Sequence, residues 1–247
     1  MYNPRGGFPI RNRGMFGASG YQYQTLPYGT EGVQEGSLIS KVMGLLASSF
    51  LVAFIGTLVG IFVLNLSYGG GYWVVAIGGF IVLLVLNFNI NTPGLNLFLL
   101  YLFTFLEGLA LAPLIALYLN IQNGGTILAE AFFLTAVTSL ALAVYAWITK
   151  RNFNRLGGIL FMGVILLIVA MLISIFFHST FFALLISVLG VGIFSAYVLY
   201  YVQQAKYLAD TMPNAIGLTV SLFITVLNLF LFILRILSIV QGGNRRS

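Results

Sequence analysis

The chain has 247 residues, of which 60% are hydrophobic and only 6% are charged, whereas a soluble domain carries about 25% charged residues. This composition excludes a water-soluble globular protein, and apolar runs of about 20 residues without strict alternation favour transmembrane helices over a barrel. The formal net charge of +6 is spread around these runs rather than gathered in one patch, so it indicates membrane topology and not nucleic-acid binding.

Residues 1–37 form a polar tail rich in Gly, Tyr and Arg, with no acidic residue before Glu31. It has too few periodic apolar positions to bury a core, so we predict an irregular segment outside the membrane. Its lack of acids is typical of a mitochondrial transit peptide, but early Pro and Gly residues oppose the amphipathic helix that such a peptide needs. We expect this tail to offer contacts to a partner protein.

Seven apolar segments follow the tail, each long enough to cross about 30 Å of hydrocarbon as a helix. Stretches of turn-forming residues separate them, such as SYGGG at 67–71 and ADTMPN at 209–214. The sequence therefore predicts an all-α integral membrane protein with a seven-helix domain at 38–240 and a basic C-terminal tail at 241–247. The predicted spans are 38–66, 72–88, 95–120, 127–149, 156–177, 180–207 and 214–240.

Basic residues orient the seven spans, because Lys and Arg of short loops stay on the cytoplasmic side or its equivalent. Trp73 and Trp147 lie at span ends, where an aromatic belt is expected. Arg245 and Arg246 fall on the opposite face, so either the rule is broken locally or one span is re-entrant. The basic residues that share one face are Arg5, Arg11, Arg13, Lys41, Lys150, Arg151, Arg155 and Lys206.

Acidic residues inside a membrane are costly and indicate function by default. Two acids lie in the tail and Asp210 lies in a predicted loop, which leaves Glu107 within the third span and Glu130 near the start of the fourth. We expect Glu130 at the interface, where a helix N-terminus favours a negative charge. Glu107 either lines a polar pathway, pairs with a base such as Arg235, or is neutral and hydrogen-bonded.

The last span carries a mostly polar stripe, because its polar residues follow a 4-3-4-3 spacing that places them on one helical face. This face should point inward, either as hydrogen-bonding contacts between helices or as the wall of a cavity. The stripe consists of Ser221, Thr225, Asn228, Phe232 and Arg235. Together with Glu107, its polar members Ser221, Thr225, Asn228 and Arg235 form our candidate intramembrane polar site.

The first span contains a GxxxG pattern, Gly56-Thr-Leu-Val-Gly60, which permits the close approach of a second helix. The pattern is common in membrane helices and predicts packing rather than transport.

No combination of residues in the sequence fits a catalytic site. With one His, no Cys and no Asp within a span, the chain lacks the groups of a metal hydrolase, a Ser-His-Asp triad or a retaining carboxylate pair. No nucleotide-binding GxxxxGK[ST] pattern occurs either. We expect His178 to be an interfacial residue rather than a metal ligand, and we predict a protein without catalytic residues, cofactor or metal.

Three segments resemble the third, sixth and seventh spans of the Bax inhibitor family: LEGLALAPL at 106–114, FSAYVLYYVQQAK at 194–206 and SLFITVLNLFLFILRIL at 221–237. The resemblance covers 38–240 and implies six helices around a central C-terminal seventh. Members are described as calcium- and proton-sensitive leak channels of several membranes, and as regulators of cell death or membrane proteolysis.

The family's pore latch is a pair of aspartates in the sixth and seventh spans. The matching positions here are Tyr201, in Tyr200-Tyr201-Val202-Gln203, and Thr225, three residues before Asn228. Two carboxylates shift each other's pKa and offer the anionic oxygens that Ca²⁺ prefers, whereas Tyr and Thr do neither near neutral pH. The resemblance therefore implies the family fold with its calcium and proton latch lost, and we do not expect calcium as a ligand.

These observations predict a non-catalytic accessory or structural subunit of a membrane assembly, which contacts the lipid bilayer and other membrane-protein subunits. The alternative is a surviving ion leak lined by Glu107, Asn228 and Arg235, and a third reading is a regulator of cell death or of membrane proteolysis. The acid-poor tail is compatible with the mitochondrial inner membrane, and a bacterial plasma membrane fits almost as well.

Overall fold

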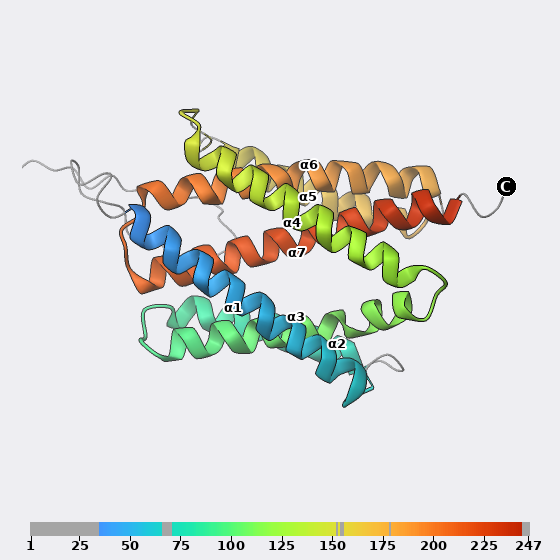
Figure 1. Ribbon diagram of the computed structural model, residues 1–247, viewed down its shortest axis with the longest axis horizontal. Coiled ribbons are helices and arrows are strands. Elements are labelled where there is room, and N and C mark those ends of the chain that lie inside the picture. The colour runs from blue at the N-terminus through green and yellow to red at the C-terminus, as the bar shows by residue number, and fades with distance from the viewer. Residues whose placement is uncertain (1–34, 66–70, 152, 154–155, 178, 244–247) are drawn as a thin grey trace, which may run out of the picture.

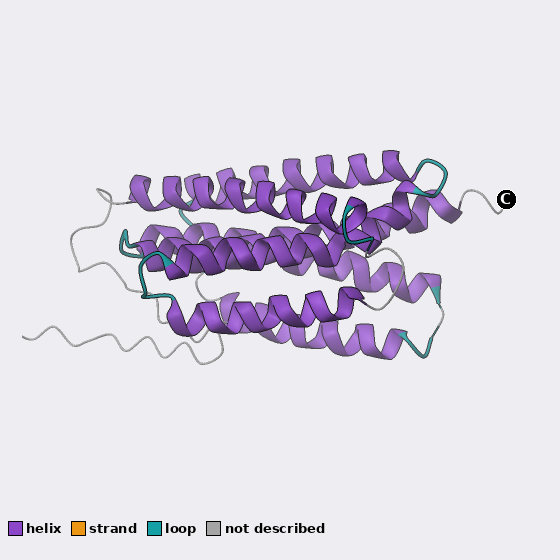
Figure 2. Ribbon diagram, turned by 90° about the horizontal axis from the view of Figure 1, so that it is seen from below, coloured by secondary structure: helices purple, strands orange, loops and turns teal. Residues whose placement is uncertain are grey.

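The computed structural model describes residues 35–65, 71–151, 153, 156–177 and 179–243 as a bundle of helices (Figures 1 and 2). Residues 1–34 of the N-terminal tail, Arg155, His178 and the final residues 244–247 lie outside the described residues, and so do the predictions made for them. The helices are α1 (Glu35–Phe62), α2 (Gly71–Asn89), α3 (Leu95–Leu119), α4 (Gly124–Ile148), α5 (Leu156–Ser174), α6 (Thr180–Gln204), the short 3₁₀ helix η1 (Ala205–Tyr207) and α7 (Met212–Gly243).

The all-α fold with seven long helices is confirmed, and every helix overlaps one predicted span. Six of the helices are long and apolar enough to cross a membrane, and α2 contributes a shorter apolar segment, Trp73–Asn89. Large apolar side chains such as Phe88 and Phe176 point outward and are 86% and 82% exposed. An outer surface of this kind is stable only in lipid.

Helix α7 is the centre of the bundle, as the family resemblance implied. Four apolar clusters fill the interior, and each contains α7 side chains. Phe223 packs with residues of α1, α2 and α3, Leu222 with α1, α4 and α6, Leu229 with α4, and Phe232 with α5 and α6. All six other helices therefore contribute to the core around α7, with α2 packed mainly on α3 and α5 mainly on α6.

The predicted close approach of α1 is confirmed, and its partner is α3. A Cβ atom placed on Gly56 would lie 2.3 Å from the Phe105 carbonyl oxygen, and one placed on Gly108 would lie 1.9 Å from the Ala53 carbonyl oxygen. The Thr57 hydroxyl donates a hydrogen bond to the Gly108 carbonyl oxygen at 2.9 Å across the same contact. Small residues thus allow the two backbones to touch, which is how helices associate in lipid.

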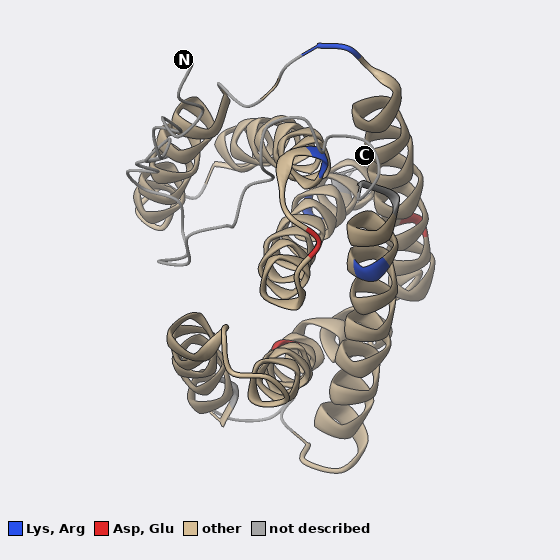
Figure 3. Ribbon diagram, turned by 90° about the vertical axis from the view of Figure 1, so that its left-hand side faces the viewer, with Lys and Arg blue, Asp and Glu red and all other residues tan. Residues whose placement is uncertain are grey.

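Alternating helix direction gathers the starts of α1, α3, α5 and α7 and the ends of α2, α4 and α6 at one end of the bundle. We call this the basic end, because it holds the basic residues Lys41, Lys150, Arg151 and Lys206; Figure 3 looks onto it. The distribution of basic residues predicted from the sequence is thus reproduced by the described helices. A cytoplasmic orientation of this end remains a prediction.

Candidate functional site

The polar stripe of α7 satisfies its hydrogen bonds largely within its own helix. The Thr225 hydroxyl donates to the Ser221 carbonyl oxygen at 2.7 Å, and the Asn228 amide donates to the Ile224 carbonyl oxygen at 2.8 Å. Thr225 is only 3% exposed, which confirms the expected inward orientation at this position. Side chains bonded in this way are tolerated in the core and are not committed to a ligand.

Packed side chains occupy Tyr201 and Thr225, the two positions to which the family resemblance assigns the latch. Tyr201 of α6 lies against the apolar cluster that includes Leu222 of α7. Its ring stacks on Tyr197 with the centroids 5.5 Å apart and meets the Tyr200 ring edge-on at 5.2 Å. A tyrosine cluster therefore stands where the family resemblance places one aspartate, and neither this cluster nor Thr225 supplies a carboxylate.

Glu107 lies at the middle of α3, and the structure does not bring it to Arg235. Its carboxylate faces α2, where a Cβ atom placed on Gly79 would be 3.5 Å from Glu107 Oε1. Tyr118 of α3 and Ser238 of α7 fix the relative height of these parallel helices through a 2.5 Å hydrogen bond between their hydroxyls. Measured from this hydrogen bond toward the start of each helix, the Glu107 Cα lies about 16 Å away along α3 and the Arg235 Cα about 5 Å away along α7, at 1.5 Å per residue. The Cα atoms of Glu107 and Arg235 are thus separated by about 12 Å along the bundle.

Glu130 does not lie at a helix N-terminus, so that expectation is wrong. Helix α4 begins at Gly124, earlier than predicted, and has no acidic residue in its first turn. The Glu130 carboxylate instead accepts a hydrogen bond from the Gln241 amide of α7 at 2.5 Å. The helix starts early because the turn is tight: a Cβ atom on Gly124 would lie 1.8 Å from the Tyr118 carbonyl oxygen, so only glycine fits there.

A shallow cavity of about 230 Å³ lies near this contact, at the end of the bundle opposite the basic end. Its wall is mainly apolar, with the Tyr118 and Ser238 hydroxyls at its edge. The lining residues are Leu117, Tyr118, Ile121, Gln122, Ile127, Ser238, Gln241 and Gly242. The described residues hold no group of three His, Asp or Glu side chains that could bind a metal ion.

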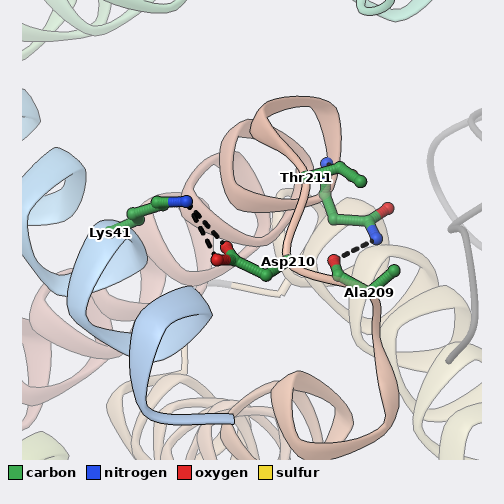
Figure 4. Close-up of polar contacts among 5 residues, drawn as sticks. Lys41, Ala209, Asp210 and Thr211 are labelled. Atoms are coloured by element: carbon green, nitrogen blue, oxygen red, sulfur yellow. Dashed lines mark hydrogen bonds and ion pairs between the residues drawn. The ribbon is translucent and has the colours of Figure 1, made fainter. Parts of the chain in front are cut away.

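An ion pair at the basic end ties α1 to the connection between α6 and α7 (Figure 4). The Lys41 ammonium lies 3.0 Å from both carboxylate oxygens of Asp210. Partial burial alone would raise the pKa of Asp210, but hydrogen bonds from Ser37 and Lys41 and the Lys41 charge lower it. The same loop is held by Asn214, whose amide donates to the Ala209 carbonyl oxygen at 2.7 Å.

We expect Asp210→Asn to lower thermal stability slightly, by about 0.5 kcal/mol, because exposed ion pairs contribute little and Lys41 is 46% exposed. Since the pKa of Asp210 is lowered in the folded protein, its contribution is present above about pH 4 and is lost as the pH falls through the folded pKa. Melting of both proteins in detergent at neutral and acidic pH tests this. A difference in melting temperature between them that stays constant as the pH falls would contradict the stabilising role of this ion pair.

The end of α6 clamps the connection between α4 and α5. The Gln203 amide donates to the Arg151 carbonyl oxygen, while its own carbonyl oxygen accepts from the Phe153 backbone N–H. The Lys206 ammonium donates to two carbonyl oxygens in the last turn of α4, those of Ala146 and Trp147, and lies 5.3 Å from the Trp147 ring centroid. Carbonyls at a helix C-terminus otherwise lack partners, so these bonds fix where α4 ends.

We expect Gln203→Leu to destabilise the protein by about 1 to 3 kcal/mol, because it leaves an N–H group and a carbonyl oxygen without their partner. Gln203 is 2% exposed, so water cannot fully replace it. The neighbouring Gln204→Leu is the matched control, since the buried Gln204 Oε1 accepts no hydrogen bond from the described residues. Gln203→Leu should melt at a lower temperature than Gln204→Leu. Equal losses of melting temperature would contradict the role of the Gln203 hydrogen bonds in holding the connection between α4 and α5.

Comparison with known proteins assigns the chain to a family. The family model described as "Inhibitor of apoptosis-promoting Bax1" matches residues 35–242, which includes all seven long helices. The chain belongs to the Bax inhibitor family. Family membership agrees with the central position of α7 and with the three segments that suggested the family from sequence.

Relatives of this Bax inhibitor family protein occur in bacteria, animals and viruses. An uncharacterized protein of Campylobacter jejuni is 35% identical over 202 residues, which cover 81% of this chain and 87% of that protein. Protein lifeguard 4 of Mus musculus is 30% identical over 68% of each chain. The Golgi anti-apoptotic protein of Vaccinia virus (strain Lister) is 27% identical over 82% of this chain and 85% of its own length.

Proposed function

We propose that this Bax inhibitor family protein is a non-catalytic accessory or structural subunit of a membrane assembly. The observation that carries the proposal is the filling of both latch positions by the stacked Tyr201 ring and the buried, internally bonded Thr225. Neither side chain can switch between charged and neutral forms near neutral pH. A protein that keeps the family fold without this switch is suited to holding partners in the bilayer.

The plasma membrane of a bacterium is the location that we propose, in preference to a mitochondrial inner membrane. The Campylobacter jejuni relative supports it, because the match extends over most of both chains. The name of the viral relative refers to the Golgi and belongs to that protein.

The test is the native mass of the protein after extraction from its own membrane in a mild detergent, with mass spectrometry of co-migrating proteins. A large assembly of defined stoichiometry supports the subunit role. Migration of a lone 26.9 kDa chain in detergent contradicts it and favours the alternative, an ion leak. That alternative predicts Ca²⁺ flux through the purified protein in liposomes, abolished by Glu107→Gln. Recovery of a membrane protease or of cell-death proteins would instead identify a regulator.

A further inference from the structure

Glu107 has surroundings that suit a proton rather than a metal ion or a salt bridge. It lies midway along α3 (Leu95–Leu119), about 18 Å from each end at 1.5 Å per residue. The carboxylate lies beside the Gly78-Gly79 pair of α2. A Cβ atom on Gly79 would sit 3.5 Å from Glu107 Oε1, and one on Gly78 would meet nothing within 4 Å. Gly79 therefore places no side chain beside the carboxyl group, while Gly78 faces open space.

The charged side chains described on the helices that pack against α3 are engaged elsewhere or lie at another height. Lys41 of α1 is bonded to Asp210, and Glu130 of α4 is bonded to Gln241. Arg235 of α7 lies about 12 Å further along the bundle, by the 1.5 Å rise per residue used above. Helix α2 has no charged residue between Gly71 and Asn89. Within the described part of the chain, no ion pair joins a base to Glu107.

An ionised carboxylate without a counter-charge is strongly disfavoured at the centre of a bilayer, whereas the neutral acid is tolerated there. We propose that Glu107 is a proton-binding site, reached by apolar reagents past Gly79 of α2. The site is separate from the latch positions Tyr201 and Thr225, and it does not depend on the proposed subunit role.

A hydrophobic carbodiimide is a suitable probe of this site, because it enters lipid and reacts with protonated carboxyl groups. The acid proton moves to one carbodiimide nitrogen while a Glu107 oxygen bonds to the central carbon, converting one C=N bond to C–N. Migration of the acyl group to the other nitrogen gives a stable N-acylurea. Nothing leaves, so the chain gains the mass of one whole carbodiimide.

The experiment treats the full-length protein in liposomes with dicyclohexylcarbodiimide and locates the adduct by peptide mass spectrometry. We expect one adduct on Glu107, none in Glu107→Gln, and a rate that falls about tenfold per pH unit once the acid begins to ionise. Glu107→Gln should fold normally, since glutamine resembles the neutral acid. The protonated carbonyl stretch in the infrared spectrum should also disappear in Glu107→Gln, which is a readout independent of the reagent.

Two glycine variants on the same helix test access past Gly79. Gly79→Leu places a side chain beside the carboxyl and should slow labelling severalfold, whereas Gly78→Leu points into open space and should leave the rate unchanged. Absence of the Glu107 adduct in folded protein, a rate independent of pH, or equal rates in the two glycine variants would overturn the proposal. The subunit role would be untouched by that failure, because it is tested by native mass.

Discussion

Gly108→Ala is expected to lower the melting temperature strongly, because the added methyl group would clash with the backbone of α1. The new Cβ would lie 1.9 Å from the Ala53 carbonyl oxygen and 2.7 Å from its carbonyl carbon. Both are backbone atoms, so no side-chain rotation relieves the clash and α1 must move away from α3. Overpacking usually costs about 1 to 3 kcal/mol, and we expect this substitution at or above the upper limit.

The loss of stability in Gly108→Ala should exceed the cost of the steric clash alone. Moving α1 outward lengthens the hydrogen bond from the Thr57 hydroxyl to the Gly108 carbonyl oxygen, which is 2.9 Å in the native bundle. It also opens the Gly60 contact, where a Cβ would lie 2.5 Å from Ala112 Cβ. Helix association in lipid rests on such close packing, because lipid chains are as apolar as the side chains.

Gly44→Ala in α1 and Gly125→Ala in α4 are the matched controls, since a Cβ on either glycine meets nothing within 4 Å. Alanine favours a helix over glycine by about 1 kcal/mol, so these variants should be as stable as the native protein or more so. Thermal melting in detergent, followed by tryptophan fluorescence, compares all three. If Gly108→Ala melts together with the controls, the close approach of α1 and α3 is wrong.

The sequence predicted the helices because lipid imposes a simple rule on long apolar segments. It also predicted the glycine contact of α1, because Gly56 and Gly60 recur at a spacing that places them on one face. It could not identify α3 as the partner or Gly108 as the opposing residue. Those depend on the rotation and height of each helix, which periodicity within one helix does not specify.

The same limit explains the outcome for the polar residues. Glu107 stands out in the sequence because a charge within a span is unusual, but the sequence contains no reason to choose Gly79 over Arg235 as its neighbour. From the sequence alone Asp210 is only a loop acid, because its partner Lys41 is distant along the chain. Gln203 belongs to the segment that resembles the family's sixth span, and nothing in that segment indicates that its side chain holds the connection between α4 and α5.

Replacing both latch positions with aspartate, as Tyr201→Asp with Thr225→Asp, is expected to destabilise the bundle without producing a calcium leak. Thr225 is 3% exposed near the middle of α7, where an aspartate costs about 3 kcal/mol in a membrane helix. Tyr201→Asp also removes a ring that stacks on Tyr197 and packs against the apolar cluster that includes Leu222.

The measurement pairs thermal melting with Ca²⁺ flux in liposomes across neutral and acidic pH. Tyr201→Phe with Thr225→Val is the control, because it keeps the side-chain volume and leaves both positions uncharged. This control should stay folded and show no Ca²⁺ flux. A latch needs two carboxylates together with surroundings that tolerate their charge and let it change. Here the surroundings are the tyrosine stack and the apolar cluster around Leu222, so restored acids alone should not restore a switch. A folded double variant with a pH-gated leak would show that the channel machinery survives around the latch, and it would refute the subunit role.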